Sequence, residues 1–468
     1  MKGDLMAERF WGYHSEWNLG SPGGWDYQRI TQTIGKAVWQ RLFRKRSIDI
    51  DLDFDHPFLH PVNGFVAMLQ EAHRSREGSG PGLIAVVAEQ ETLEVVVENS
   101  NLVAHLNAVE GLSGALMAPH ELELRNGRVC WKGQPVSIIF MDFNTDVLLD
   151  LHRRHDLTPL LQAVGEGRVI NPRGTEPINA KSMFEVITDP RNAGRFHQET
   201  IQRTPWTRQF YPRKTFGPQG EEIPDLVEWT RSHWEGLVLK PERGYSGKGV
   251  CVGGIHHDID DIIERALRKG DYIVQEKIPL HLWSEMLPEL DMAARTVTEV
   301  SFQTDFRCLF GGHGLFGFLG RYGGVPTNVG SGGGVQPLGV LRSTMDVGEA
   351  TQRINDAILA MDFGDVLEAV EHQMKMSMDH RFTYLLGPIK MALRPRLITP
   401  GQMEALEAYC AGIWSDCLTM EGMWLSGDLG VNVTIEPEEM AIIRSQSWGG
   451  SPAIFASDGL FSFGAHRR

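Results

Sequence analysis

Cysteine is scarce in this chain, with five among 468 residues, an odd number that is scattered and forms no CxxC pair. This scarcity argues against a disulfide scaffold or a structural zinc site and favours a reducing compartment, the cytoplasm. Long hydrophobic runs are also absent. No stretch of about eighteen apolar residues exists, so we expect no membrane span. The opening stretch MKGDLMAERFWGYHSEW lacks the apolar core of a signal peptide.

Positive charge is in deficit. The chain has 45 Lys and Arg against 60 Asp and Glu, which gives a net charge of −15. Such a surface repels nucleic-acid backbones, so we expect no nucleic-acid partner, whereas a local basic pocket with magnesium still accommodates a nucleotide. The hydrophobic share of 42% and the charged share of 22% are typical of a globular protein, and the length predicts two or three domains.

The first part of the chain alternates strand and helix patterns, which indicates an α/β domain over residues 1–167. The sequence RNGR between two strand patterns predicts a hairpin turn. The expected elements are a half-buried strand at 47–54, helices at 61–77 and 99–112, buried strands at 83–89 and 136–143, and a helical stretch at 147–167.

Two further segments follow, at 168–345 and 346–468. The second begins with RVINPRGTEPINAKSMFEVITD, which predicts a strand, a Pro/Gly loop and a helix that carries Lys181 near its start. A helix at 259–270, begun by Asp258, and strands at 271–280 and 295–310 are expected next. The third segment has mainly helical patterns and ends in a Gly/Ser-rich tail.

The stretch EGLVLKPERGYSGKGVCVGG places Lys240 before a cluster of glycines that includes Lys248. Closely spaced glycines let backbone N–H groups approach phosphate. A Walker P-loop is excluded because Gly249, not Ser or Thr, follows Lys248 and position 242 is glutamate. A dinucleotide fingerprint is excluded because a strand pattern, not a helix, follows the glycines. A kinase loop is excluded because the lysine precedes the glycines.

A strand lysine, a glycine hairpin and then VQEKI about 25 residues later follow the order of the ATP-grasp fold. The chain resembles, in particular, the circularly permuted ATP-grasp ligases of the glutathionylspermidine synthetase group, over about residues 130–340. The resemblance implies two α+β lobes that clamp ATP, an N-terminal α/β pre-ATP-grasp domain and a mainly helical C-terminal region. The fold class expected is therefore α/β.

The resemblance also implies the ATP-binding residues. Lys240 and Lys181 would contact phosphates, Glu276 would hold the ribose, and Val238 and Val274 would enclose the adenine. Lys248 is either a second phosphate contact or a solvated loop tip. The full expected set is Lys181, Lys240, Gly244, Ser246, Gly247, Lys248, Gly249, Gln275, Glu276 and Ile278.

For magnesium, the resemblance implies Asp305 and Asn328 as ligands, with Arg321 and Lys240 as catalytic residues. Hard cations require such oxygen donors. The family pattern is Glu-x-Asn, but position 326 here is proline, so the second carboxylate is left unassigned and Glu299 is one candidate.

The resemblance implies an ATP-dependent ligase that joins a carboxylate to an amine through an acyl-phosphate, with small-molecule substrates and a place in specialised metabolism. Two alternatives stay open: a phosphotransferase on the same scaffold and a non-catalytic nucleotide-binding protein, which the missing glutamate before Asn328 makes possible. Whether the chain forms a homodimer is open as well. Residues 442–461 are the C-terminal stretch expected to shape the acceptor pocket.

Overall fold

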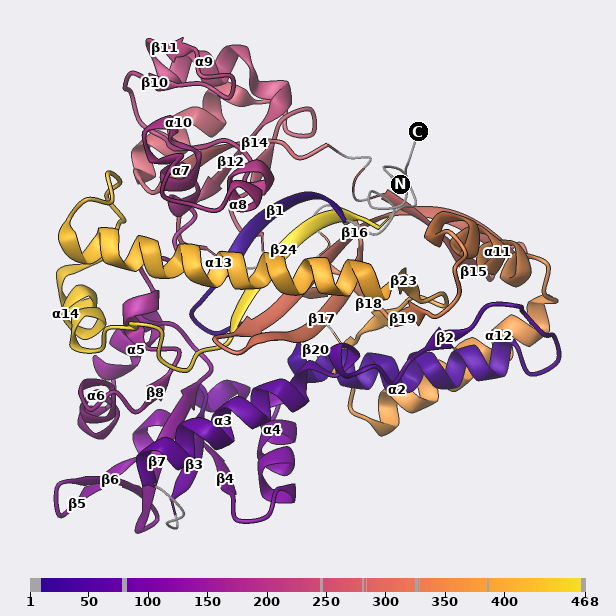
Figure 1. Ribbon diagram of the computed structural model, residues 1–468, viewed down its shortest axis with the longest axis horizontal. Coiled ribbons are helices and arrows are strands. Elements are labelled where there is room, and N and C mark those ends of the chain that lie inside the picture. Colours follow the sequence, from indigo (N-terminus) through magenta and orange to yellow (C-terminus); the bar gives the residue numbers. More distant parts are fainter. Residues whose placement is uncertain are drawn as a thin grey trace.

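The computed structural model describes residues 10–77, 82–244, 247–279, 282, 284–324, 327, 329–384 and 387–463. The chain has a mixed α/β fold, as the sequence predicts. Figure 1 shows a lobe at the top, a large sheet crossed by a long helix in the middle, and a second α/β unit at the lower left. Short 3-10 turns lie at Pro57–Leu59, Gln90–Thr92, Pro119–Glu121, Arg173–Thr175, Pro190–Asn192, Trp234–Gly236 and Val329–Ser331.

The lower α/β unit is built on parallel strands β4 (Ser113–Met117), β3 (Leu83–Val87), β7 (Gln134–Met141) and β8 (Val169–Ile170). Every residue of β3 is buried, since helices cover parallel sheets on both faces. The predicted hairpin is confirmed as β5 (Glu123–Arg125) and β6 (Arg128–Trp131), and both residues of its turn have positive φ. The helices are α3 (Pro61–Glu77), α4 (Val97–Ala108), α5 (Thr145–His152) and α6 (Thr158–Gly165).

Two sequence expectations in this region are wrong in detail. The strand expected over 47–54 shrinks to β2 (Leu52–Asp53), which pairs with β19 (Leu338–Leu341). The helical stretch at 147–167 divides into α5 and α6, because Pro159 is tolerated only in the first turn of a helix and so marks a new start.

The upper lobe holds an antiparallel sheet in the order β13 (Cys251–Val252), β12 (Leu237–Pro241), β14 (Tyr272–Glu276) and β9 (Thr207–Gln209). Helices α9 (Leu226–Ser232) and α10 (Ile259–Lys269) cover one face. Asp258 caps α10 as predicted, by accepting a hydrogen bond from the backbone N of Asp261. The lobe also contains α7 (Met183–Thr188), α8 (Gln198–Arg203), β10 (Thr215–Phe216) and β11 (Glu222–Ile223).

The large sheet joins the two ends of the described chain. Its order is β1 (Trp11–Asn18), β24 (Phe455–Ser462), β16 (Thr296–Gly311), β17 (Gly314–Gly323), β18 (Gly334–Gln336) and β22 (Lys390–Met391), with β15 (Ser284–Asp291) on β16. β1 and β24 pair antiparallel and lie side by side in Figure 1. The sheet therefore draws on all three predicted segments, and the expected Gly/Ser-rich tail contains a fully buried strand.

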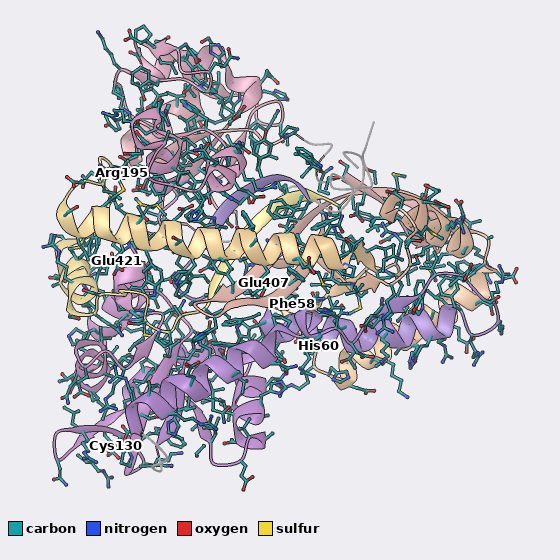
Figure 2. All side chains as sticks on the ribbon, in the orientation of Figure 1. Phe58, His60, Cys130, Arg195, Glu407 and Glu421 are labelled. Carbon is teal, nitrogen blue, oxygen red and sulfur yellow. The ribbon has the colours of Figure 1, made fainter. Side chains whose placement is uncertain are left out.

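Helix α13 (Pro400–Ser426) crosses the large sheet, begun by a Thr399 capping box and ended by Gly427 in the left-handed conformation. Glu421, labelled on α13 in Figure 2, accepts hydrogen bonds from the backbone N of Trp448 and Gly449, which fixes the turn before β24. The remaining elements are α2 (Trp25–Leu42), α11 (Val347–Leu359), α12 (Phe363–Asp379), β20 (Thr383–Tyr384), β21 (Gly387–Pro388), β23 (Arg396–Ile398) and α14 (Pro437–Ser445).

All five cysteines are free and buried, which fits the expectation that they do not form a disulfide scaffold. Among the described residues, none of the helices combines the length and the apolar character needed to cross a membrane.

Candidate functional site

A cavity of about 280 Å³ lies between the upper lobe and the large sheet. Residues from β1, β12, β13, β14, β16, β17 and β24 line it, so it collects side chains that are far apart in the sequence. The residues expected from the sequence that line it are Lys181, Lys240, Gly244, Gly247, Lys248, Gln275, Glu276, Ile278, Asp305 and Arg321.

Strand alternation explains which residues of the upper lobe face the cavity. Val238 pairs with Gln275 and with Val252, and these three side chains share the cavity face. Leu239 and Val274 form the next pair and point to the opposite face, into the core beneath α9 and α10. The expectation that Val274 encloses adenine is therefore wrong. Val252, together with Ile278 and Leu460, supplies the apolar surface instead.

Two lysines meet at one end of the cavity. Lys240 Nζ donates a hydrogen bond to the backbone O of Ser15 over 3.0 Å, and its side chain is only 8% exposed. Lys181 lies just before α7; its Nζ donates to the backbone O of Gly244 at 2.7 Å and lies 3.5 Å from Glu16 Oε2. A β-bulge at Ser15 in β1 brings its carbonyl into reach, as bulges near functional sites often do.

Burial lowers the pKa of Lys240 from 10.5, the ordinary lysine value, to about 8. The neighbouring charge of Lys181 acts in the same direction, and the Glu16 carboxylate acts against it. Lys240 is thus a buried cation whose hydrogen-bond acceptor is a neutral carbonyl. An anion bound beside it would stabilise its charged form.

The glycine-rich turn forms the rim of the cavity. Gly249 has φ of +77°, and a Cβ there would lie 2.9 Å from the Tyr272 hydroxyl, so this position requires glycine. Lys248 is exposed and lines the cavity, which leaves both of its predicted roles open. Ser246 lies outside the described residues.

Two residues at the end of β14 complete the upper wall. Gln275 is buried and its Nε2 donates to Thr207 Oγ1 at 2.9 Å. The side chain of Glu276 is exposed at the cavity edge, while its backbone N is fixed by the carbonyl of Trp206 at 2.8 Å. Glu276 is thus a carboxylate on a rigid strand end, free to accept hydroxyl donors.

The opposite wall carries paired carboxylates and arginines. Asp305 and Arg321 are cross-strand neighbours, and Arg321 donates two hydrogen bonds to Asp305, each of 2.7 Å. Thr327 Oγ1 donates to Asp305 at 2.6 Å. Arg321 Nη2 also donates to Asp458 Oδ2 at 2.9 Å, and Arg307 holds Asp458 with two bonds of 2.6 Å.

Asp458 lines the cavity but is not among the site residues expected from the sequence. It pairs with Glu16 on β1 and with Arg307 on β16, and it is 3% exposed. Despite its burial, the two arginines hold its pKa well below the ordinary range for aspartate, and the same ion pairs raise the pKa of Arg321. Its only sequence signal is its position within residues 442–461, the stretch expected to shape the acceptor pocket.

The carboxylates fit a hard cation. One Oδ atom of Asp305 and one of Asp458 lie within 3 Å of the same Arg321 nitrogen, so both converge on one positively charged point. Within the described ranges there is no group of three or more His, Cys, Asp or Glu poised to hold a metal. Magnesium bound by one or two carboxylates and by substrate phosphates needs no such group.

The two remaining candidates for metal ligands are Glu299 and Asn328. Glu299, one candidate for the second carboxylate, does not line the cavity, and its Oε1 accepts a hydrogen bond from Asn355 Nδ2 at 2.8 Å. Glu299 lies before Asp305 on β16, in the part of that strand that pairs with β15, where its partner is Pro288. Asn328 lies outside the described residues.

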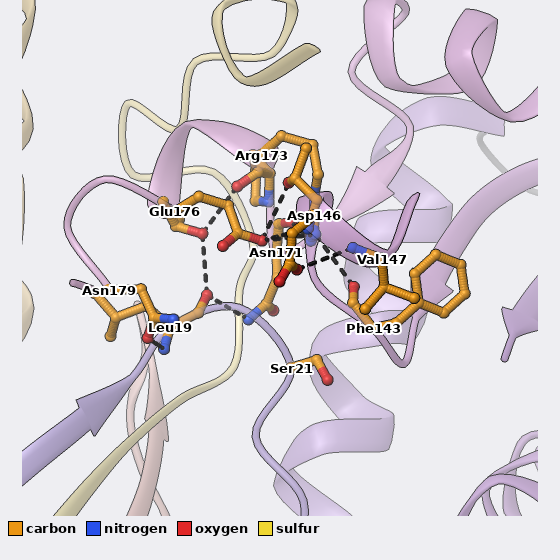
Figure 3. Close-up of polar contacts among 12 residues, drawn as sticks. Leu19, Ser21, Phe143, Asp146, Val147, Asn171, Arg173, Glu176 and Asn179 are labelled. Atoms are coloured by element: carbon orange, nitrogen blue, oxygen red, sulfur yellow. Dashed lines mark hydrogen bonds and ion pairs between the residues drawn. The ribbon is translucent and has the colours of Figure 1, made fainter. Parts of the chain in front are cut away.

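The loop before Lys181 is held by buried polar contacts, shown in Figure 3. Asn171 Nδ2 donates to the carbonyls of Leu19, at 2.9 Å, and Ile454, at 2.7 Å, so it joins the end of β1 to the start of β24. Arg173, fully buried, donates to Glu176 Oε1 at 3.2 Å and to the Phe143 carbonyl at 3.3 Å. This cluster fixes the position of Lys181 relative to β1 and β24.

No family model and no curated protein matches the chain. Among solved structures, it is similar to a glutathione synthetase-like effector from Globodera pallida in apo form, with 13% identity, a TM-score of 0.39, 65% of this chain and 61% of that chain covered. A RimK-domain ATP-grasp protein from Sphaerobacter thermophilus matches with 16% identity, a TM-score of 0.28 and coverage of 61% and 100%. D-alanine–D-alanine ligase from Bacillus anthracis matches with 15% identity, a TM-score of 0.27 and coverage of 73% and 96%.

The match to the effector spans only 61% of the effector's length, and all three TM-scores are below 0.5. The similarity to ATP-grasp proteins therefore rests on the residues themselves. An upper lobe with a strand lysine and a glycine rim faces a large sheet with acidic strand positions, in the order that the resemblance to ATP-grasp proteins implies.

Proposed function

We propose that the chain is a magnesium- and ATP-dependent ligase that joins a carboxylate to an amine. The observation that supports this most is the convergence of Lys181, Lys240, Asp305 and Asp458 on one cavity between two lobes. Two cations at one end match a polyphosphate, and two carboxylates at the other match the magnesium that accompanies it. Magnesium, when bound, neutralises phosphate charge and orients the phosphate oxygens.

In the proposed reaction the carboxylate oxygen takes the γ-phosphoryl group of ATP, and ADP leaves. The amine nitrogen then bonds to the carbonyl carbon and loses a proton to water. The carbon–oxygen bond to phosphate breaks, and phosphate leaves with the electron pair. The protein contributes positioning and charge rather than covalent chemistry. Lys240 and Lys181 hold phosphate oxygens, Glu276 accepts from the ribose hydroxyls, and the apolar face of Val238 receives the adenine.

Arg321 has a particular place in this scheme. It lies between the two aspartates, so it occupies the point where a cation would be held. Asp305 and Asp458 would hold the metal, and Arg321 would supply a fixed positive charge beside them that stabilises the transferring phosphoryl group.

The test is a reaction with Mg²⁺, ATP and panels of amino acids, peptides and amines, followed by ADP release. A carboxylate labelled with ¹⁸O then reports the path, because an acyl-phosphate transfers one labelled oxygen to the released phosphate. The D458N and K181M variants are expected to lose ADP release, whereas K375M, an exposed lysine on α12, is expected to keep it. A phosphorylated product without an amide would establish the phosphotransferase alternative, and Mg·ATP binding without any turnover would establish the non-catalytic one.

A further inference from the structure

The C-terminal segment formed by residues 432–446 connects the upper lobe to the lower unit. It contains α14, which lies beside α5 and α6 at the left of Figure 1. At the end of the segment, Gln446 Nε2 donates a hydrogen bond to the carbonyl of Val169 on β8 at 2.8 Å. At its start, the carbonyl of Asn432 accepts a hydrogen bond of 2.7 Å from Gln209 Nε2 on β9. The segment is therefore fastened to both parts of the molecule.

A buried ion pair fastens the residues after β12 to this segment. The Arg243 guanidinium donates two hydrogen bonds to the Glu439 carboxylate, one of them 2.8 Å long. Glu439 lies on α14 and is 2% exposed. The neighbouring Glu242 is bound as well, since its Oε2 accepts a hydrogen bond from the backbone N of Thr434 at 3.1 Å. Removal of one partner of a buried ion pair leaves the other charge uncompensated, so this pair holds Arg243 to α14.

The residues on both sides of Arg243 hold Lys181. The carbonyl of Glu242 accepts a hydrogen bond from the backbone N of Lys181 at 3.0 Å. The carbonyl of Gly244 accepts a hydrogen bond from Lys181 Nζ at 2.7 Å. Residues 242–244 thus set the position of both the main chain and the ammonium group of Lys181. A shift of Arg243 would move both of these acceptors.

Arg243 and Glu439 lie behind the cavity rather than in its wall. Lys181 and Gly244 line the cavity, whereas Arg243 and Glu439 do not. A nucleotide in the cavity would contact Lys181 directly, and it would sense the ion pair only through residues 242–244. The ion pair can therefore act on nucleotide binding by fixing Lys181, because a phosphate contact depends on the exact place of the ammonium group.

We propose that Arg243 and Glu439 are positioning residues that fix Lys181 for its contact with the phosphates. This inference rests on the proposed function for the identity of the nucleotide, and on the contacts of residues 242–244 for the path from Glu439 to Lys181. The C-terminal segment then takes part in nucleotide binding although Glu439 does not touch the nucleotide.

The test is a double-mutant cycle on Mg·ATP binding, measured by calorimetry with the full chain and the variants E439Q, K181M and E439Q/K181M. R243K, which keeps the charge of the pair but not its two-bonded geometry, is the conservative variant. D26N is the matched control, because Asp26 is a buried carboxylate on α2 that accepts two hydrogen bonds from Arg29 and does not line the cavity. Amide hydrogen exchange without nucleotide follows the backbone N–H of Lys181, and thermal melting verifies that each variant is folded.

We expect E439Q to bind Mg·ATP about tenfold more weakly than the wild type, R243K to lose less affinity, and E439Q to cause no further loss in the K181M background. The Lys181 amide is expected to exchange faster in E439Q. D26N is expected to melt lower than the wild type but to keep its affinity and its exchange rate.

Equal losses of affinity from E439Q with and without Lys181, unchanged affinity in E439Q, or unchanged exchange of the Lys181 amide would overturn the inference. Failure of the ligase proposal gives a different result, in which the wild type releases no ADP with any substrate pair while the coupling between Glu439 and Lys181 persists.

Discussion

Replacing Lys240 with methionine is expected to stabilise the nucleotide-free protein while weakening its binding of Mg·ATP. Lys240 is 8% exposed, and one neutral carbonyl, that of Ser15, accepts the hydrogen bond of its ammonium group. Burial lowers its pKa from 10.5 to about 8. Methionine keeps most of the volume and removes the charge, so the substitution separates the role of the charge from that of packing.

The sign follows from proton linkage. The folded protein holds the Lys240 proton less tightly than the unfolded chain does, so the unfolded chain binds more protons between pH 8 and pH 10.5. The contribution of Lys240 to the stability of the wild type therefore rises across that pH window, and it is lowest below pH 8. The difference in pKa corresponds to a penalty of about 3 kcal/mol at neutral pH. Loss of the hydrogen bond to Ser15 offsets about 1 kcal/mol, which leaves a gain of about 2 kcal/mol.

The assay is thermal melting of wild type and K240M from pH 7 to pH 10.5, with K248M, an exposed lysine of the glycine rim, as the control. K240M is expected to melt higher at pH 7, and the difference is expected to shrink as the pH rises and the wild-type lysine loses its proton. Calorimetry is expected to show Mg·ATP binding weakened about tenfold to a hundredfold, the value of a charged hydrogen bond. A K240M protein that melts at or below the wild type at pH 7 would refute the reasoning.

The remaining predictions concern the loop before Lys181 and the ribose contact. R173M is expected to lower the free energy of unfolding by about 3 kcal/mol, because it leaves the buried Glu176 carboxylate without Arg173. Denaturant titration measures this change. An unchanged midpoint would argue against the ion pair as a structural element. E276Q is expected to weaken ATP binding about tenfold and leave the melting temperature unchanged, since Glu276 is exposed. Comparison of ATP with 2′-deoxy-ATP checks that the ribose is the partner of Glu276. Equal losses of affinity for both nucleotides would contradict the ribose contact.

The residues that could be predicted from the sequence are those whose signal is local. Lys240 lies on a strand beside its glycines, Lys181 precedes a helix after a Pro/Gly loop, and Glu276 ends a strand of apolar residues. Each pattern fits in about twenty residues, so no knowledge of distant pairing was needed to place it.

Asp458 and Glu16 could not be predicted because they depend on the pairing of β1 with β24, which joins opposite ends of the described chain. The sequence around Asp458 contains small residues and glycine, which are more typical of loops than of a buried strand. The error at Val274 has a related cause. Only the register of β12 against β14 decides whether Val274 or Gln275 shares a face with Val238, and a shift of one residue exchanges the faces.

The most direct test of the central claim is a crystal structure of the protein with a non-hydrolysable ATP analogue and Mn²⁺ in place of Mg²⁺, located by its anomalous scattering. We expect the triphosphate between Lys181 and Lys240, and the metal in contact with carboxylate oxygens of Asp305 and Asp458, beside Arg321. A nucleotide bound outside this cavity, or a metal that contacts neither aspartate, would contradict the account.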